Sequence, residues 1–288
     1  MTLGSWIRHR SSRQTGRGDS ELVVSHFEPV RRNWLGGLAL LLAVVAMSPA
    51  PALADDAVAI IGRVKPSVVA VGTFERTRTP QFSFRGTGFV VDDGTLVVTN
   101  AHVMPGPLDG NRMEQVGVLI PQPGNAPAAF REARMVATDP GTDLALLKIG
   151  GTPLPALRIG DSDAVKEGQS IMMTGFPIGA VLGPYAATHR GMIAAIAPIA
   201  IPQANSGNLD PKVIRRLTLG AFNIFQLDAT AYPGNSGSPI YDGSSGAVLG
   251  IVNMVLVKGT KEAVLSQPSG ITYAVPSKYL VELLQKAR

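Results

Sequence analysis

The stretch GTGFVVDDGTLVVTNAHV, residues 86–103, decides the fold class of this chain. Two valine-rich runs, 86–92 and 95–103, are separated by a short cluster of turn residues, which is typical of β-strands. Similar runs follow one another along most of the chain, with turn clusters between them. The further runs are 67–74, 115–120, 133–139, 143–149, 169–176, 187–197, 222–229, 247–257 and 270–276. Short strands that recur about every 8–12 residues predict an all-β sandwich or barrel.

The extent of the β-rich part favours two small barrels over one. About eleven predicted strands extend over about 230 residues. The stretch GGTPLPALRIGDSD, near residues 150–165, is rich in glycine and proline and is a suitable place for a boundary. We therefore expect an N-terminal β-barrel over residues 55–155 and a C-terminal β-barrel over residues 156–288.

Two segments of the mature chain have helical patterns. Residues 56–64 can form one short helix, since Pro66 follows shortly after them. Residues 277–288, SKYLVELLQKAR, place their leucines on one face, and we expect Ser277 to be the N-cap of this helix.

The first 54 residues have the pattern of a secretory signal peptide. Arg31-Arg32 precede the apolar run WLGGLALLLAVVAM, residues 34–47, which is shorter than the roughly 20 residues that a membrane-spanning helix needs. Ala52-Leu53-Ala54 fits the small-residue cleavage pattern. We therefore expect residues 1–54 to be removed and the product to be exported. If the segment stayed uncleaved, it would tether the protein to a membrane.

Composition excludes two classes of function. The chain has no cysteine, so disulfides and cysteine-ligated metal sites are excluded. The net charge of +5 arises mainly from six arginines within residues 1–33, and the other 20 basic and 18 acidic residues nearly balance. A chain with so little net charge has no electrostatic surface for nucleic acid, and we expect no nucleic-acid partner.

Two histidines remain once the signal segment is removed. His102 lies at the end of a predicted strand, where Asn100 and Pro105 mark the departure of the chain from the sheet. A histidine in that position can face a cleft and act as a base, although a structural role is the simpler alternative. His189 lies inside an alternating strand pattern, which predicts a solvent-facing position.

A candidate nucleophile and a candidate acid accompany His102. Ser236 lies in AYPGNSGSPI, residues 231–240, which has more turn residues than a simple hairpin needs. Glycine leaves backbone N–H groups uncovered, so those of Gly234 and Ser236 can converge on an oxyanion. A long β-turn with an exposed serine is the alternative. Asp143 precedes a leucine-rich strand, and a buried carboxylate needs a partner such as an imidazole N–H; a turn residue is the alternative.

The order of these residues distinguishes between classes of serine hydrolase. The α/β-hydrolases need a histidine after the serine, and no histidine follows Ser236. The order His102, Asp143, Ser236 is the chymotrypsin-type order, and it fits an all-β chain of two barrels.

These segments resemble the trypsin-like serine proteases of the bacterial HtrA/Deg type over nearly the whole mature chain. Residues 86–103 are similar to the histidine segment of that family, and DPGTDLALLKI is similar to its aspartate segment. QLDATAYPGNSGSPIYDGSSGAVLGIVNM is similar to its serine segment. The resemblance implies the chymotrypsin-like fold, with two six-stranded antiparallel β-barrels, a short N-terminal helix and a C-terminal helix.

The resemblance also implies a function and a set of site residues. It implies a serine endopeptidase, periplasmic or secreted, that hydrolyses polypeptide substrates through an acyl-enzyme and needs no metal or organic cofactor. The implied residues are a catalytic His102, Asp143 and Ser236, an oxyanion hole at Gly234, Asn235 and Ser236, and a substrate pocket at Thr230, Ala231 and Asn253. The oligomeric state is left open: an oligomer is compatible with the sequence but is not predicted by it.

Two departures from the family pattern and the residues of the pocket limit what the family implies. Ser238 replaces the usual second glycine, as in secreted glutamyl endopeptidases, but the strand 247–257 lacks the histidine with which those enzymes hold glutamate. Neither Thr230 nor Ala231 is acidic, so we expect a small-to-medium apolar P1 residue rather than lysine or arginine. We expect no PDZ domain, because the second barrel uses the 52 residues after Ser236.

Two alternative functions belong to the same fold. A catalytically silent protein would bind peptides or partner proteins, and a latent enzyme would need an activator for its loops. The candidate loops are residues 104–114, 121–131 and 202–218.

Overall fold

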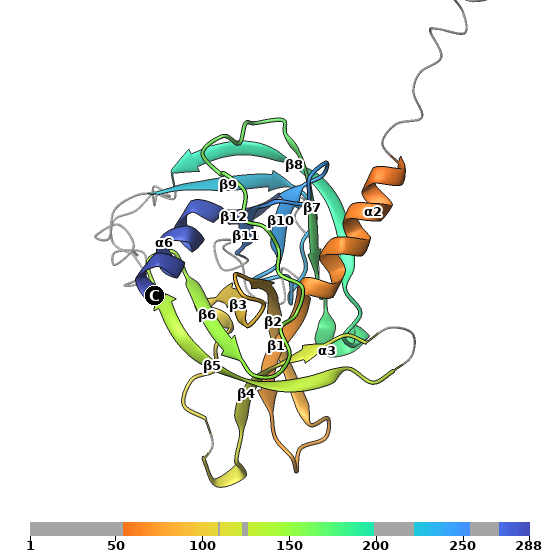
Figure 1. Ribbon diagram of the computed structural model, residues 1–288, viewed down its shortest axis with the longest axis vertical. Coiled ribbons are helices and arrows are strands. Elements are labelled where there is room, and N and C mark those ends of the chain that lie inside the picture. The colour runs from red at the N-terminus through yellow and green to blue at the C-terminus, as the bar shows by residue number, and fades with distance from the viewer. Residues whose placement is uncertain (1–53, 109, 123–125, 199–221, 254–270) are drawn as a thin grey trace, which may run out of the picture. The chain divides into compact units, whose positions relative to one another are not determined.

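Two closed antiparallel barrels of six strands each form the body of the computed structural model (Figure 1). The structure describes residues 54–108, 110–122, 126–198, 222–253 and 271–288. The first barrel contains β1 (Val68–Phe74), β2 (Phe82–Val91), β3 (Leu96–Asn100), β4 (Gln115–Ile120), β5 (Ala129–Asp139) and β6 (Leu144–Ile149). The second contains β7 (Ser170–Gly175), β8 (Ala187–Pro198), β9 (Asn223–Asp228), β10 (Pro239–Asp242), β11 (Val248–Val252) and β12 (Ile271–Pro276). The predicted fold class is confirmed.

The two barrels have the same strand topology. The order around the first is β1-β2-β3-β6-β5-β4, and β7 to β12 repeat that order in the second. In each barrel the third strand therefore pairs with the sixth, although two other strands lie between them in the sequence. This neighbourhood brings the end of β3 to the beginning of β6.

The predicted strands correspond to all but one of the observed strands. The exception is β10, a strand of four residues that begins at Pro239 directly after the glycine- and serine-rich turn. Proline is tolerated at the first position of a strand. Because Pro239 directly follows turn residues, the sequence indicated a continuing turn there and the strand was not predicted. β5 begins at Ala129, inside the predicted loop 121–131. The predicted strand residues 254–257 lie outside the described part of the chain.

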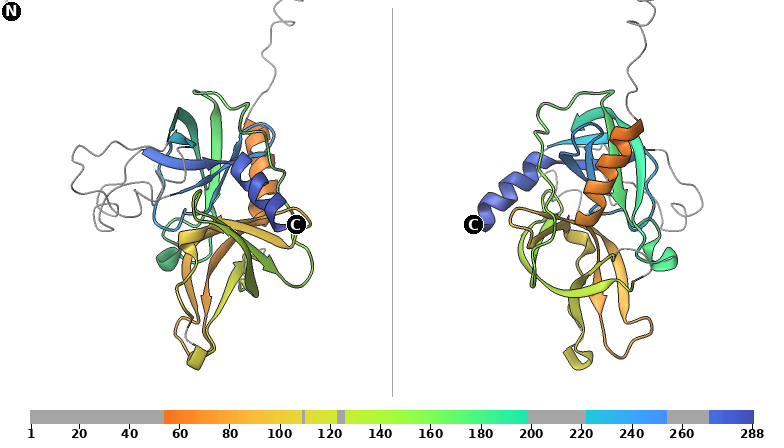
Figure 2. Two further views of the ribbon diagram at one scale, coloured as in Figure 1. Left: turned by 90° about the vertical axis from the view of Figure 1, so that its left-hand side faces the viewer. Right: turned by 45° about the vertical axis from the view of Figure 1, so that its right-hand side comes forward.

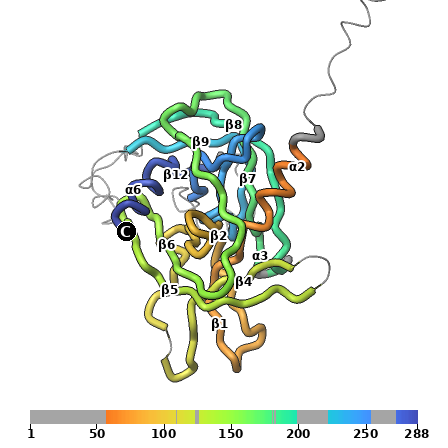
Figure 3. Tube along the Cα trace, in the orientation of Figure 1, coloured from red at the N-terminus to blue at the C-terminus, as the bar shows by residue number. Residues whose placement is uncertain are grey.

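The chain passes from one barrel to the other through residues 150–169, which can be followed in Figure 3. Leu157 still donates its backbone N–H to Val90 of β2, at 2.9 Å. Two residues later, Ile159 forms a bridge with Val248 of β11, and the Gly160 N–H donates to the Val248 carbonyl. The change of barrel therefore takes place between Leu157 and Ile159.

One helix precedes the two barrels in the sequence and another follows them (Figure 2). α2 (Ala54–Val64) is predicted as 56–64 and begins two residues earlier, and α6 is Ser277–Ala287. Ile60 and Val64 of α2 lie against the turn at Gly246 of the second barrel. α6 contacts β5 and β6 of the first barrel as well as β11 and β12 of the second. The shorter elements are helix α3 (Gly179–Leu182) and the 3₁₀ turns Lys65–Ser67, Ala101–Val103 and Gly110–Arg112.

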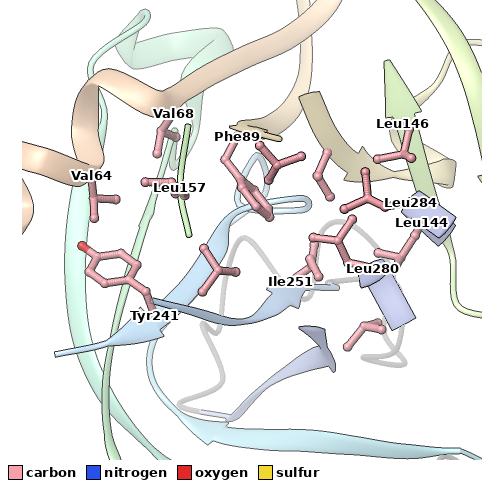
Figure 4. Packing of buried hydrophobic residues seen from close by; sticks show 14 of the residues in the cluster. Val64, Val68, Phe89, Leu144, Leu146, Leu157, Tyr241, Ile251, Leu280 and Leu284 are labelled. Carbon is pink, nitrogen blue, oxygen red and sulfur yellow. The ribbon is translucent and has the colours of Figure 1, made fainter. Parts of the chain in front are cut away.

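A single hydrophobic cluster joins these helices to both barrels (Figure 4). Val64 of α2 and Leu280 and Leu284 of α6 belong to it, together with Phe89 of the first barrel and Tyr241 of the second. Because burial of apolar surface is the dominant favourable term in folding, this cluster stabilises the two barrels as one unit.

The predicted N-cap of the last helix is wrong. Ser277 is the first residue of α6, and the residue in the cap position is Pro276, which makes no side-chain cap hydrogen bond. The Ser277 hydroxyl instead donates to the Gly160 carbonyl oxygen at 2.8 Å, which ties the helix to the segment between the barrels. A tertiary partner has replaced the local one that the sequence pattern indicated.

Leu280→Ala should destabilise the protein by about 2–5 kcal/mol, because it leaves a cavity in the cluster that spans both barrels. Leu280 is fully buried, whereas its neighbour Val281 is 37% exposed on the same helix. Val281→Ala is the matched control and should cost less than about 1 kcal/mol. The free energy of unfolding from denaturant titration gives the comparison, and equal losses in the two variants would contradict this role of α6.

Candidate active site

His102 and Asp143 meet at one edge of the first barrel, because β3 and β6 are neighbouring antiparallel strands. Asn100, the last residue of β3, pairs with Leu144, the first residue of β6. His102 lies in the 3₁₀ turn that follows β3, and Asp143 directly precedes β6. His102 Nδ1 lies 2.6 Å from Asp143 Oδ2, and the His102 backbone N–H donates to Oδ1 at 2.9 Å. Since a carboxylate accepts hydrogen bonds, Nδ1 is the protonated nitrogen of the neutral ring, and Nε2 keeps its lone pair.

Hydrogen bonds to its backbone and the packing of the next residue hold Asp143 in place. Its backbone has the left-handed φ of 59°, which a residue other than glycine keeps when its surroundings determine it strongly. The Asp143 carbonyl oxygen accepts from the Ala101 N–H at 2.9 Å and from Asn100 Nδ2 at 3.1 Å. Leu144, the next residue, is anchored in the core cluster (Figure 4). These contacts hold the carboxylate against the imidazole.

Asn253 completes the surroundings of the Asp143 carboxylate from the other barrel. It directly follows β11, is buried, and donates from Nδ2 to Asp143 Oδ2 at 2.9 Å. From the sequence, Asn253 was expected in the substrate pocket, and its contact with Asp143 was not predicted. A buried polar residue at the end of an apolar strand was the available signal, since such a residue needs a partner.

Ser236 reaches the first barrel beside the turn that carries His102. A side-chain carbon placed on Gly86 would lie 2.7 Å from the Val103 side chain and 3.0 Å from the Ser236 carbonyl oxygen. Val103 directly follows His102, so the serine segment lies against the histidine turn. Ser236 is 6% exposed, and among the described residues no hydrogen bond joins its hydroxyl to His102.

The residues before Ser236 form a tight turn with two unused donors. The Asn235 N–H donates to the Tyr232 carbonyl oxygen at 2.9 Å, with Pro233 and Gly234 between them. Gly234 has a φ of 103°, and proline followed by a glycine with positive φ is typical of a type II turn. In the described part of the chain the N–H groups of Gly234 and Ser236 donate to no acceptor, whereas the Asn235 N–H is used by the turn itself.

The side chains of Asn235 and Ser238 point to the back of this turn. Both are fully buried, and the Asn235 amide and the Ser238 hydroxyl have no hydrogen-bond partner within the described ranges. A side-chain carbon on Gly175 of β7 would overlap the Ser238 hydroxyl and lie 2.9 Å from Asn235 Oδ1. The serine that departs from the family pattern therefore lies against the second barrel, where Gly175 makes room for it.

His189 faces the interior of the second barrel, so the predicted solvent-facing position is wrong. It is half-buried and pairs with Met173, which belongs to the core cluster of the second barrel, and paired residues of neighbouring strands point to the same face. Its ring centre lies 6.4 Å from that of Tyr232 at the start of the serine turn, and its Nε2 is buried without a partner in the described chain. Burial disfavours the charged ring and lowers the pKa of His189 below its usual 6.5.

The two remaining candidate pocket residues lie next to this turn. Ala231 is 3% exposed and belongs to the core cluster of the second barrel, while Thr230 is half-buried. Gly191, two residues after His189 on β8, approaches the side chain of Ala229 closely. The inner face of β8 therefore runs beneath the segment that leads to Ser236.

The comparisons with known proteins identify the family. The model of the trypsin-like peptidase domain matches residues 86–251, which are more than half of the chain, so the chain belongs to this family. A protein of Marinomonas sp. (strain MWYL1), named a probable periplasmic serine endoprotease DegP-like, is 30% identical over 214 residues. That alignment covers 72% of this chain and 36% of the relative. The predicted resemblance to the HtrA/Deg type is confirmed.

A relative of the same name from Chlamydia pneumoniae is 31% identical over 194 residues, 67% of this chain and 32% of the relative. The chain thus spans about a third of the length of these curated relatives. Among solved structures, the HtrA-type protease AlgW with a decapeptide has the same fold, with a TM-score of 0.58 and 24% identity over 80% of this chain and 67% of that one. AlgW with a tripeptide aligns with a TM-score of 0.56 and 25% identity, over 80% of this chain and 62% of that one.

The described residues also bear on membrane spans and metal sites. No helix there is both long and apolar enough to cross a membrane. Within the same ranges, no three histidine, aspartate or glutamate side chains gather as the ligands of a metal ion would.

His189→Gln should flatten the loss of stability at acid pH. A histidine whose folded-state pKa is lowered contributes stability above its unfolded pKa, and this contribution is lost as pH falls. The unfolding free energy of the wild type should therefore decrease more than that of the variant between about pH 7 and about pH 5. Denaturant titrations at both pH values measure this, and parallel decreases would show that His189 is not a source of acid sensitivity.

Proposed function

We propose that this protein is an exported serine endopeptidase in which His102 is the general base, Asp143 orients it and Ser236 is the nucleophile. The observation that carries the proposal is the His102–Asp143 pair, joined at 2.6 Å and placed beside a serine turn with two unused N–H groups. The relatives named as periplasmic serine endoproteases support both the activity and export.

The geometry suits hydrolysis through an acyl-enzyme. Nε2 of His102 would take the hydroxyl proton of Ser236 as its oxygen attacks the substrate carbonyl carbon. The carbonyl oxygen becomes an oxyanion, and the N–H groups of Gly234 and Ser236 are the free donors for it. His102 then gives the proton to the leaving amine, and a water repeats the sequence on the ester. The bond to Asp143 stabilises the charged ring between these transfers.

Polypeptides are the proposed substrates, and the protein is proposed to act outside the cytoplasm. Solved relatives of the same fold are described with a decapeptide and a tripeptide bound. The predicted signal segment, residues 1–54, lies almost entirely outside the described residues, so export rests on its sequence pattern and on the names of the relatives. The candidate loop 202–218 also lies outside the described residues.

Ser236→Ala should abolish labelling of the protein by a fluorophosphonate, because the probe reacts with an activated serine hydroxyl. Ser238→Ala is the matched control two residues away, and it should retain labelling and stability, since its buried hydroxyl has no partner among the described residues. Intact-protein mass spectrometry measures the adduct. A wild type that is never labelled would indicate the silent alternative, and labelling that appears after an activator is added would indicate the latent one.

Asp143→Asn should lower kcat by about 10⁴-fold, since an amide in this place holds the imidazole in the wrong tautomer. Steady-state cleavage of a chromogenic peptide gives the rate. The variant should remain folded, because the amide has the shape of the carboxylate and its oxygen can still accept the His102 backbone N–H while its NH₂ group faces Nδ1. Activity within about tenfold of the wild type would remove Asp143 from the mechanism.

Cleavage should be selective for a small-to-medium apolar residue at P1. Thr230 and Ala231 are the proposed pocket residues, and neither carries a charge that would attract lysine, arginine or glutamate. Sequencing the products of a peptide library measures this preference. A profile dominated by a charged P1 residue would contradict the assignment of the pocket.

A further inference from the structure

Thr87 connects the first barrel to the serine turn through hydrogen bonds that the sequence did not predict. It lies in β2 and is fully buried. Its backbone N–H donates to the Ser236 carbonyl oxygen at 2.8 Å, and its hydroxyl donates to the Gly234 carbonyl oxygen at 2.7 Å. The same hydroxyl accepts the Phe176 N–H at 3.1 Å, and the Thr87 carbonyl accepts the Thr99 hydroxyl at 2.7 Å.

The direction of the Thr87 hydroxyl bond follows from its two neighbours. A hydroxyl has one proton to donate. The Phe176 N–H can only donate, and the Gly234 carbonyl oxygen can only accept. The Thr87 proton therefore points at Gly234, and the position of the hydroxyl is fixed from both sides.

These bonds restrain the peptide groups that carry the two unused donors. The peptide between Gly234 and Asn235 is held at its carbonyl by Thr87 and at its N–H by Tyr232. The carbonyl of Ser236 is held by the Thr87 backbone. The peptide that carries the Ser236 N–H lies between these two fixed groups, and the one that carries the Gly234 N–H precedes them directly. The carbonyls of the two donor peptides are held as well, that of Asn235 by the Ser238 N–H at 2.9 Å and that of Pro233 by the Ile178 N–H at 2.7 Å. Removal of the Thr87 hydroxyl would therefore loosen the peptide group between them, at glycine, the residue with the greatest backbone freedom.

The two barrels also approach each other closely at the residue that follows Ser236. A side-chain carbon on Gly237, which has a φ of 87°, would overlap the Thr87 carbonyl oxygen. The residue after Ser236 therefore lies directly on β2, and the Gly237 N–H donates to Val252 at 3.0 Å on its other side.

We propose that Thr87 is a positioning residue of the oxyanion hole: its hydroxyl keeps the N–H groups of Gly234 and Ser236 directed at the substrate carbonyl. The role rests on the proposed function, since it acts through the turn and not on the substrate. The first barrel carries the histidine and the aspartate. Through Thr87 it would also help to stabilise the oxyanion.

The test compares Thr87→Val, which keeps the shape and removes the hydroxyl, with Thr87→Ser, which keeps the hydroxyl. Thr174→Val is the matched control. Thr174 is a fully buried strand threonine whose hydroxyl bonds to Tyr241 at 2.7 Å and to Thr188 at 2.8 Å. Its hydroxyl has no bond to the serine turn. Thr87→Ala gives a second route if the valine variant does not fold.

Loss of the Thr87 hydroxyl should lower kcat by about 10-fold to 10³-fold, the upper end being the cost of losing one oxyanion donor outright. KM for a peptide amide should stay within about threefold, because the ground-state carbonyl depends less on these donors. The affinity for a peptide boronate or aldehyde, which places an oxygen in the hole, should fall in parallel with kcat. Thr87→Ser should restore both values, and Thr174→Val should lower thermal stability without lowering kcat.

An active wild type with an equally active Thr87→Val variant overturns the role of Thr87 alone, as does a Thr174→Val variant that loses as much kcat. A rise in KM at unchanged kcat overturns it too, since that result indicates a contact with substrate binding. A wild type that neither cleaves peptides nor reacts with a fluorophosphonate overturns the proposed function, and the role of Thr87 with it.

Discussion

Hydrogen bonds across the contact between the two barrels are the constraint on which the site depends. Asn253 of the second barrel donates to the carboxylate of Asp143 in the first, at 2.9 Å. In the other direction, Thr87 of the first barrel holds the carbonyls of Gly234 and Ser236 in the second, at 2.7 and 2.8 Å. Each barrel therefore contributes hydrogen bonds to the half of the site that the other barrel carries. The apolar cluster that joins both barrels to helices α2 and α6 keeps these polar contacts in register.

Burial explains why the Asp143 carboxylate has so many hydrogen-bond partners. An unpaired carboxylate is costly in a low-dielectric interior, and Asp143, at 7% exposure, accepts from His102 and Asn253 through its side chain. The same carboxylate thereby fixes the imidazole, so the requirement for folding and the requirement for chemistry coincide. The opposite situation occurs behind the serine turn, where the Asn235 amide and the Ser238 hydroxyl are buried without partners in the described part of the chain.

The sequence predicted the features that local patterns control. Valine-rich runs predicted the positions of the strands, and the order of His102, Asp143 and Ser236 indicated the class of site. Pairing between distant strands controls the features that it missed. The inward orientation of His189 follows from its partner Met173, and the contact of Asn253 follows from the packing of one barrel on the other. The spacing of residues along the chain does not determine which distant strands pair, so a polar residue such as Asn253 can signal that it needs a partner but not which partner it has.

The most direct test of this account is a crystal structure of the protein after reaction with a peptide phosphonate. We expect phosphorus to be bonded to Ser236 Oγ and one phosphonyl oxygen to accept from the N–H groups of both Gly234 and Ser236. The Thr87 hydroxyl should remain on the Gly234 carbonyl, and His102 on Asp143. Reaction at another residue, or a phosphonyl oxygen turned away from these two N–H groups, would contradict it.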